Sequence, residues 1–125
     1  MPSLRVLPDL VWLHRFDTGG DVDLSTLGGS WWSVTCSGNE ISVASEAPEL
    51  DDAEQTNGPF RVFQVDGPID HLTSGVVAHV SRPMAEAGIS IFAMSTFDSC
   101  NVLVHAERLD EAVDALLLAG WEIHS

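Results

Sequence analysis

The segment PMAEAGISIFAMSTFDSCNVLV, residues 83–104, decides the fold because its hydrophobic periodicity changes within one short stretch. Apolar residues keep the spacing of one helical face up to Ala87, and Gly88 is typical of a helix end. Two aliphatic, β-branched runs follow, residues 89–94 and 102–105, on either side of the polar residues 95–101. The segment therefore predicts the end of a helix followed by an antiparallel hairpin.

The residues before this segment predict a strand and the body of the helix. Residues 60–65 alternate with a period of two and end at the turn signal Asp66-Gly67-Pro68. Apolar side chains then recur every three or four residues from position 76 onward, with Thr73 or Ser74 as the expected N-cap. Because this spacing continues past Pro83, we expect one kinked helix and not two elements.

The residues after the segment predict a second helix and a last strand. One helical face carries Leu109, Ala112, Val113, Leu116 and Leu117. Gly120 follows the helix and residues 121–124 form a short strand. The order over residues 60–125 is β-α-β-β-α-β, which predicts an α+β, ferredoxin-like fold with four antiparallel strands and two helices on one face.

The N-terminal half predicts a degenerate copy of this unit. A strand at residues 10–16 is followed by a Gly- and Asp-rich link and a hairpin of residues 31–36 and 41–45. We expect this half to pack on the open face of the C-terminal sheet. Residues 47–59, rich in acids, Pro and Gly, read as a solvated connector. The predicted domains are therefore residues 1–59 and 60–125.

Composition excludes several classes of function. Of the 125 residues, 19 are acidic and five are arginine, with no lysine, which gives a net charge of −14. That charge repels nucleic acid, and the missing lysine removes both Schiff-base catalysis and a P-loop. Two cysteines make no disulfide framework, and no apolar run is long enough for a membrane span. With so few cysteines we expect a cytoplasmic protein. We also expect neither a cofactor nor a metal: the five histidines lack the short spacing of metal ligands and are interpreted as scattered surface residues.

Several motifs resemble the ACT domain family, in particular small bacterial proteins with paired ACT-like halves, to which animal cytosolic arginine sensors are related. The resemblance covers nearly the whole chain and is most specific over residues 85–104. The motifs that carry it are Trp32-Ser33-Val34-Thr35, Ile41-Ser42-Val43, Gly67-Pro68-Ile69-Asp70, Thr73-Ser74-Gly75-Val76, Pro83-Met84-Ala85-Glu86-Ala87-Gly88-Ile89-Ser90-Ile91-Phe92, Ser95-Thr96-Phe97 and Val102-Leu103-Val104.

The resemblance implies a non-enzymatic regulatory module that binds a small ligand, typically an amino acid, where ACT units meet. Its ligand loop matches the strand-to-helix connection and the start of the helix, namely Gly67, Ile69, Asp70, Thr73, Ser74, Gly75 and Val76. A helix N-terminus offers unpaired N–H groups to an α-carboxylate, and Gly75 allows close approach of the backbone.

The opposite wall of the implied site is the segment Thr96, Phe97 and Asp98. Relatives often carry an acid where this chain has Cys100, so Asp98 or Asp70 would have to replace it beside the ligand's ammonium group. This difference favours a neutral amino acid over arginine.

Other readings of the same residues stay open. Residues 66–68 are an ordinary turn signal, and residues 73–75 are an ordinary helix cap. Cys100 and His105 could be a nucleophile and base, although no third group is evident to orient them. The alternative function is a ligand-free dimerisation or interaction module that docks through Trp31 and Trp32. In either case we expect a homodimer, and a regulatory role requires an unknown protein effector.

Overall fold

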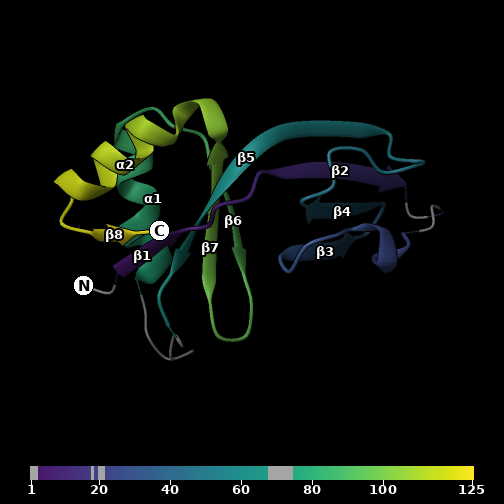
Figure 1. Ribbon diagram of the computed structural model, residues 1–125, viewed down its shortest axis with the longest axis horizontal. Helices are drawn as coiled ribbons and strands as arrows, with labels where there is room; N and C mark the ends of the chain where they lie inside the picture. Colours follow the sequence, from purple (N-terminus) through teal and green to yellow (C-terminus); the bar gives the residue numbers. More distant parts are fainter. Residues whose placement is uncertain (1–2, 18, 20–21, 68–74) are drawn as a thin grey trace. The chain divides into compact units, whose positions relative to one another are not determined.

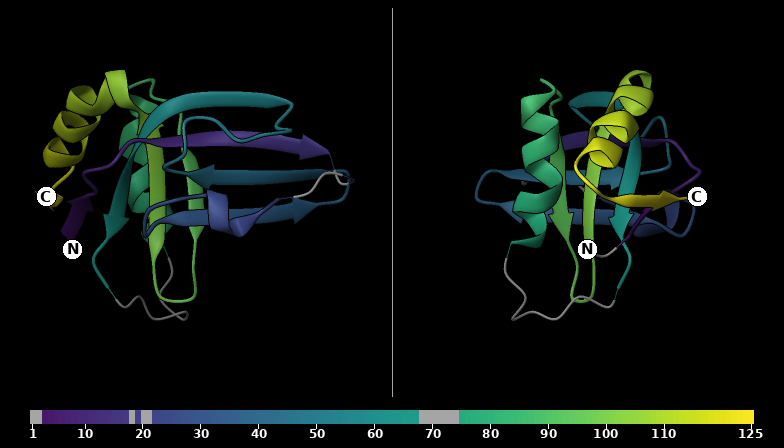
Figure 2. Two further views of the ribbon diagram at one scale, coloured as in Figure 1. Left: turned by 45° about the vertical axis from the view of Figure 1, so that its right-hand side comes forward. Right: turned by 90° about the vertical axis from the view of Figure 1, so that its left-hand side faces the viewer.

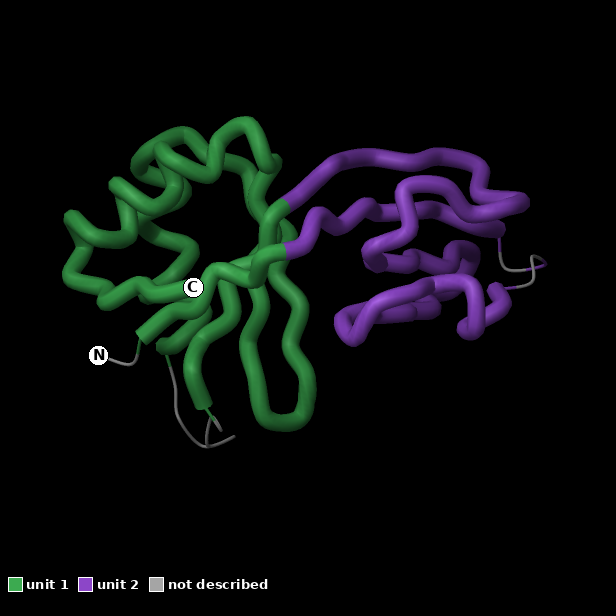
Figure 3. The backbone as a smooth tube through the Cα atoms, viewed as in Figure 1, with its two compact units in different colours: residues 1–8, 61–125 green, residues 9–60 purple. Residues whose placement is uncertain are grey.

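The computed structural model describes residues 3–17, 19, 22–67 and 75–125, and the chain divides into two compact units. Unit 1 comprises residues 1–8 and 61–125, and unit 2 comprises residues 9–60 (Figure 3). The first eight residues thus belong to the same unit as the C-terminal half. Strand β5 (Gln55–Val65) contributes its first part to unit 2 and its second part to unit 1.

Unit 1 contains a mixed sheet with the strand order β6-β7-β5-β1-β8. Its other strands are β1 (Ser3–Val6), β6 (Phe92–Ser95), β7 (Cys100–His105) and β8 (Glu122–His124). Strand β1 lies antiparallel to β5 and parallel to β8 (Figure 1). The predicted fold class is confirmed, but the predicted set of four antiparallel strands is wrong. Strand β1 is inserted between β5 and β8, where its residues Leu4 and Val6 are buried in the core.

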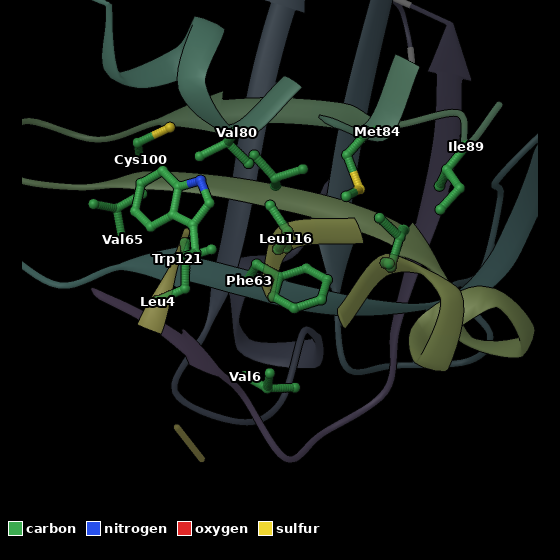
Figure 4. Packing of buried hydrophobic residues seen from close by; sticks show 13 residues of the cluster. Leu4, Val6, Phe63, Val65, Val80, Met84, Ile89, Cys100, Leu116 and Trp121 are labelled. Atoms are coloured by element: carbon green, nitrogen blue, oxygen red, sulfur yellow. The ribbon is translucent and has the colours of Figure 1, made fainter. Parts of the chain in front are cut away.

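Two helices, α1 (Val76–Glu86) and α2 (Leu109–Leu118), cover one face of this sheet (Figure 2). A short 3₁₀ turn, η2 (Ala106–Arg108), leads into α2. Their buried side chains meet those of the strands in one apolar cluster (Figure 4). The cluster consists of Leu4, Val6, Phe63, Val65, Val80, Met84, Ile89, Cys100, Val102, Val104, Ala112, Leu116 and Trp121. In the part of the chain that the structure describes, no helix is long and apolar enough to cross a membrane.

Helix α1 continues through Pro83, as predicted, because another group replaces the hydrogen bond that proline cannot make. Proline has no N–H, so the carbonyl of His79, four residues earlier, lacks its usual helical donor. The indole Nε1–H of Trp121 donates to that carbonyl at 3.0 Å. Trp121 is 3% exposed, so this bond ties the middle of α1 to the residue that precedes β8.

Both predicted helix ends are confirmed by their closing hydrogen bonds. The N–H of Ile89 donates to the carbonyl of Met84 at 2.9 Å, which spans Gly88. The N–H of Trp121 donates to the carbonyl of Leu116 at 3.0 Å, which spans Gly120. These six-to-one bonds are the pattern of a Schellman motif, in which glycine follows the last helical residue.

Unit 2 is an antiparallel sheet with the order β3-β4-β2-β5. Its strands are β2 (Val11–Asp17), β3 (Trp32–Ser37) and β4 (Glu40–Ser45), and a 3₁₀ turn, η1 (Leu24–Thr26), lies between β2 and β3. The predicted hairpin of β3 and β4 is confirmed. Phe16, Leu27 and Val43 form a buried cluster in this unit.

The predicted connector is wrong at its C-terminal end, because β5 begins at Gln55 and pairs with β2. Turn-forming residues at positions 57–59 concealed this strand. The sheet accommodates them through a register shift between Val11 and Leu13. Gly58 has a φ of +142°, and a Cβ there would lie 2.8 Å from Cδ1 of Trp12. Only glycine fits at this position. Gly58 is therefore required inside β5, although glycine in a sequence usually suggests a loop.

His14 is a second difference from the sequence-based expectation, since it is a core residue and not a surface one. Its side chain is 2% exposed on β2. Nε2 donates to the carbonyl of Ala47 at 2.9 Å, and Nδ1 lies 2.9 Å from Oγ1 of Thr56. The ring therefore joins three segments of unit 2 and satisfies both of its nitrogens.

Candidate functional site

The predicted ligand loop joins the end of β5 to the start of α1. Gly67 follows β5 and is exposed, Gly75 is the N-cap of α1, and Val76 is its first residue. Four further predicted residues, Ile69, Asp70, Thr73 and Ser74, lie outside the described residues.

Gly75 occupies the cap position that the sequence reading gave to Thr73 or Ser74. Its φ of +84° is in the left-handed region that glycine adopts without strain. A Cβ there would lie 3.7 Å from the ring of His79, an ordinary contact, so the backbone conformation and not space requires glycine. Gly75 makes no side-chain capping bond, and its carbonyl accepts the N–H of His79 at 2.9 Å. The cap residue therefore leaves the first N–H groups of α1 without a side-chain acceptor of its own.

The predicted opposite wall is the turn between β6 and β7. The N–H of Thr96 donates to the carbonyl of Ser99 at 2.9 Å, and the N–H of Ser99 donates to Oγ1 of Thr96 at 3.1 Å. The Thr96 hydroxyl thus stabilises the turn, which is a structural role and an alternative to the predicted contact with a ligand. Phe97, 79% exposed, and Asp98, also exposed, occupy the two central positions of the turn.

A chain of polar side chains leads from the sheet to this turn and was missed in the sequence analysis. Nε2 of Gln64 donates to Oδ1 of Asn101 at 3.0 Å, and Nδ2 of Asn101 donates to Oγ of Ser99 at 3.1 Å. Ser99 Oγ lies 2.5 Å from Oγ1 of Thr96. Asn101 is fully buried, and burying an amide is costly unless its hydrogen bonds are made. The one feature of the sequence that could have indicated a buried Asn101 is its position directly before an aliphatic run.

The two predicted walls lie at the same end of unit 1. Both views in Figure 2, and Figure 1, place the end of β5, the start of α1 and the β6–β7 turn together at that end. Pairing of β7 with β5 accounts for this, because β7 begins at the turn. The structure therefore brings Gly67, Gly75 and Val76 to the same end of the unit as residues 96–98.

Asp66 anchors the first residue of the loop connection to the sheet. Its carboxylate accepts hydrogen bonds from Oγ of Ser3 and, at 2.6 Å, from Nε2 of His124, and its N–H donates to the carbonyl of Ser3 at 2.8 Å. The Ser3 hydroxyl, followed by His124, lowers the pKa of Asp66. The residue before Gly67 is therefore fixed to both β1 and β8.

Cys100 lies in the apolar cluster of unit 1 and is 3% exposed. Burial raises the pKa of its thiol, which reduces the thiolate that a nucleophile requires. Its position therefore disfavours a nucleophilic role. Among the described residues, no group of three or more His, Cys, Asp or Glu side chains could hold a metal ion.

Comparison with known protein families shows to which family the chain belongs. A family model described as ACT domain matches residues 55–117, just over half of the chain. The chain belongs to the ACT domain family. No curated protein matches the sequence.

Solved structures extend this relationship to the whole ACT chain. Protein Atu0741 from Agrobacterium tumefaciens is 25% identical, with a TM-score of 0.88 over 99% of this chain and 93% of that one. VC0802 from Vibrio cholerae, a protein of unknown function and possible transport protein, is 16% identical, with a TM-score of 0.68 over 94% and 88%. The regulatory subunit of aspartate kinase from Thermus flavus is 12% identical, with a TM-score of 0.66 over 94% and 96%. The last two matches show a shared fold that includes residues before position 55.

Proposed function

We propose that this ACT domain protein binds an amino acid and acts as a regulatory module without catalytic activity. In this proposal the ligand is held at the end of unit 1 that carries both the start of α1 and the β6–β7 turn. The observation that carries the proposal is Gly75, a left-handed N-cap with no side chain to occupy the first N–H groups of α1. The shared fold with a regulatory subunit of aspartate kinase supports a regulatory role.

The chemistry of the proposed site follows from a helix N-terminus in a highly acidic protein. The N–H groups of the first turn of α1 and the helix dipole attract the α-carboxylate, which the net charge of −14 would otherwise repel. Gly67, Ile69, Asp70, Thr73 and Ser74 complete the loop in this proposal, and Phe97 supplies an apolar wall. Cys100 does not replace the acid found in relatives, because its thiol is in the core. Asp98 or Asp70 therefore receives the ammonium group.

The proposal includes a homodimer and a protein effector. Strand β6 is at the edge of the sheet in unit 1 and pairs with β7 alone among the described strands. Such edges are commonly covered in native assemblies, and a second copy of the chain is the proposed cover. Ligand binding then regulates an effector only if the two states of the dimer contact that effector differently.

A thermal-shift screen of the whole protein against the standard amino acids at millimolar concentration tests the proposal. A ligand that binds only the folded state at about 100 times its dissociation constant adds about 2.7 kcal/mol to stability. We expect an increase of several degrees in Tm with one or a few amino acids. No increase with any of them would contradict the proposal.

Gly75→Ala and Gly88→Ala form a matched pair for this screen. Both glycines have positive φ, +84° and +71°, and they lie at opposite ends of α1. Each substitution strains the backbone by about 1–2 kcal/mol. We expect Gly75→Ala to remove the ligand-induced shift and Gly88→Ala to retain it. Equal loss in both variants would show that general destabilisation, and not the cap, is responsible.

A second candidate function, the ligand-free interaction module, is favoured by one observation in unit 2. Trp32 is 44% exposed and Val34 is 38% exposed on β3, which is an edge of the sheet in the described part of unit 2. Exposed apolar side chains on a sheet edge are typical of a protein contact. If Trp32→Ala dissociates an oligomer in sedimentation experiments and no amino acid raises Tm, this function replaces the first.

A further inference from the structure

Unit 1 has a groove on its helical side. The groove, of about 260 Å³, is lined by Ala78, His79, Arg82, Pro83, Glu86 and Ala119. The first five residues recur at three- and four-residue intervals on α1 and therefore share one face of that helix. Ala119 is the C-cap of α2, so the groove lies between α1 and the end of α2.

Specific contacts fix the two walls of this groove relative to each other. The indole of Trp121 donates to the carbonyl that Pro83 leaves free, that of His79. The same residue closes α2 through its backbone N–H, which donates to the carbonyl of Leu116. Because one residue bonds to both helices, the groove is held by the core and does not depend on flexible side chains alone.

The groove carries one cationic and one anionic side chain, Arg82 and Glu86. Arg82, like Arg5 and Arg61, forms no ion pair with any residue that the structure describes, so no carboxylate within the described chain holds its guanidinium. Glu86 lies one helical turn further along the same groove, about 6 Å along the axis.

We propose that this groove is a binding site for a small zwitterion, such as a free amino acid, separate from the loop site proposed above. The guanidinium of Arg82 binds the carboxylate, since its planar donors match a carboxylate in bidentate geometry. The carboxylate of Glu86 binds the ammonium group. Ala78, Pro83 and Ala119 leave room for a compact ligand, and Glu86 disfavours a phosphate or a dicarboxylate. The site goes beyond the proposed function, which does not depend on it.

Nuclear magnetic resonance of the ¹⁵N-labelled protein can test the two sites separately. The indole N–H of Trp121 reports on the groove and is assigned with Trp121→Phe, while the amides of Thr96 and Ser99 report on the loop site. The probes are the standard amino acids at millimolar concentration, with acetate and methylammonium as half-ligands. We expect at least one amino acid to shift the Trp121 indole and the amides of Arg82 and Glu86, and the half-ligands to bind more weakly.

Variants decide whether the charges bind the probe. Arg82→Gln and Glu86→Gln should each weaken the groove's affinity by about tenfold or more. Arg5→Gln, which removes the same charge from exposed Arg5 on β1, should leave it unchanged. Shifts confined to Thr96 and Ser99 would overturn the groove and support the loop site. Shifts confined to the groove would support the groove site and contradict the loop site. The groove proposal would be overturned if neither site shows a shift, or if Arg82→Gln and Arg5→Gln lose affinity equally.

Discussion

Replacing Trp121 by Phe should reveal how α1 tolerates Pro83. The substitution keeps an aromatic ring in the core but removes the N–H that donates to the carbonyl of His79 at 3.0 Å. Pro83 cannot replace that donor, so the carbonyl loses its partner in a part-buried position. Pro83→Ala restores a backbone N–H four residues after His79, and this N–H can make the normal helical bond.

The expected loss of stability in Trp121→Phe has two contributions. A part-buried carbonyl left without a partner costs about 1–3 kcal/mol. The smaller ring at a position that is 3% exposed adds about 1 kcal/mol of lost packing, for a total of about 2–4 kcal/mol. In the Pro83→Ala background the first contribution is removed. The double variant should therefore be more stable than the sum of the single effects by about 1 kcal/mol or more.

Urea unfolding of the wild type, both single variants and the double variant measures this coupling free energy. Trp12→Phe, alone and with Pro83→Ala, is the control, because Trp12 lies in unit 2. Its effect should add to that of Pro83→Ala within about 0.5 kcal/mol. If Trp121→Phe and Pro83→Ala are also additive within that limit, the indole does not replace the missing helical donor.

Two further predictions concern Asp66 and the two cysteines. Hydrogen bonds from Ser3 and His124 lower the pKa of Asp66, so its carboxylate stabilises the fold above its ordinary pKa, and this stability is lost as the pH falls through the lowered value. Asp66→Asn should therefore lower the urea midpoint at neutral pH, with a deficit that disappears in acid; a deficit independent of pH would contradict the ionic role. Cys36 is exposed and Cys100 is buried with a raised pKa, so a disulfide reagent should modify Cys36 quickly and Cys100 only on unfolding. Cys36→Ser should abolish the fast phase, and a fast phase that persists would show that Cys100 is accessible.

Much of unit 1 could be predicted because its signals are local. The three- and four-residue spacing around Val80 and Met84, and the glycines at 88 and 120, predicted both helices and their ends. The hairpin of β6 and β7 was predicted in the same way, although β6 begins at Phe92 and not at residue 89.

The inserted strand β1 could not be predicted, because its pairing depends on residues far along the chain. Only four residues, Ser3–Val6, form it, and their pattern is too short to distinguish a strand from a tail. Its partners are Val65 and Ile123, which tertiary packing alone brings to it. The same limit applies to the start of β5, where Gly58 is required by Trp12 and not by a turn.

The candidate site was predicted only in part. The resemblance pointed to Gly75 and the turn at residues 96–98, whereas the apolar spacing had assigned the helix cap to Thr73 or Ser74, and the cap is Gly75. Gln64, Ser99 and Asn101 were missed because their hydrogen bonds join β5 to β7, and no spacing along the chain encodes that contact.

If the start of α1 binds an α-carboxylate, an amino acid and its own carboxamide should behave differently. The amino acid that gives the largest increase in Tm is measured beside the corresponding amino acid amide, which keeps the side chain and ammonium group but lacks the carboxylate. We expect an increase in Tm with the acid, little or none with the amide, and loss of this difference in Gly75→Ala. Equal increases with acid and amide, or a difference that survives in Gly75→Ala, would contradict binding of the carboxylate at α1.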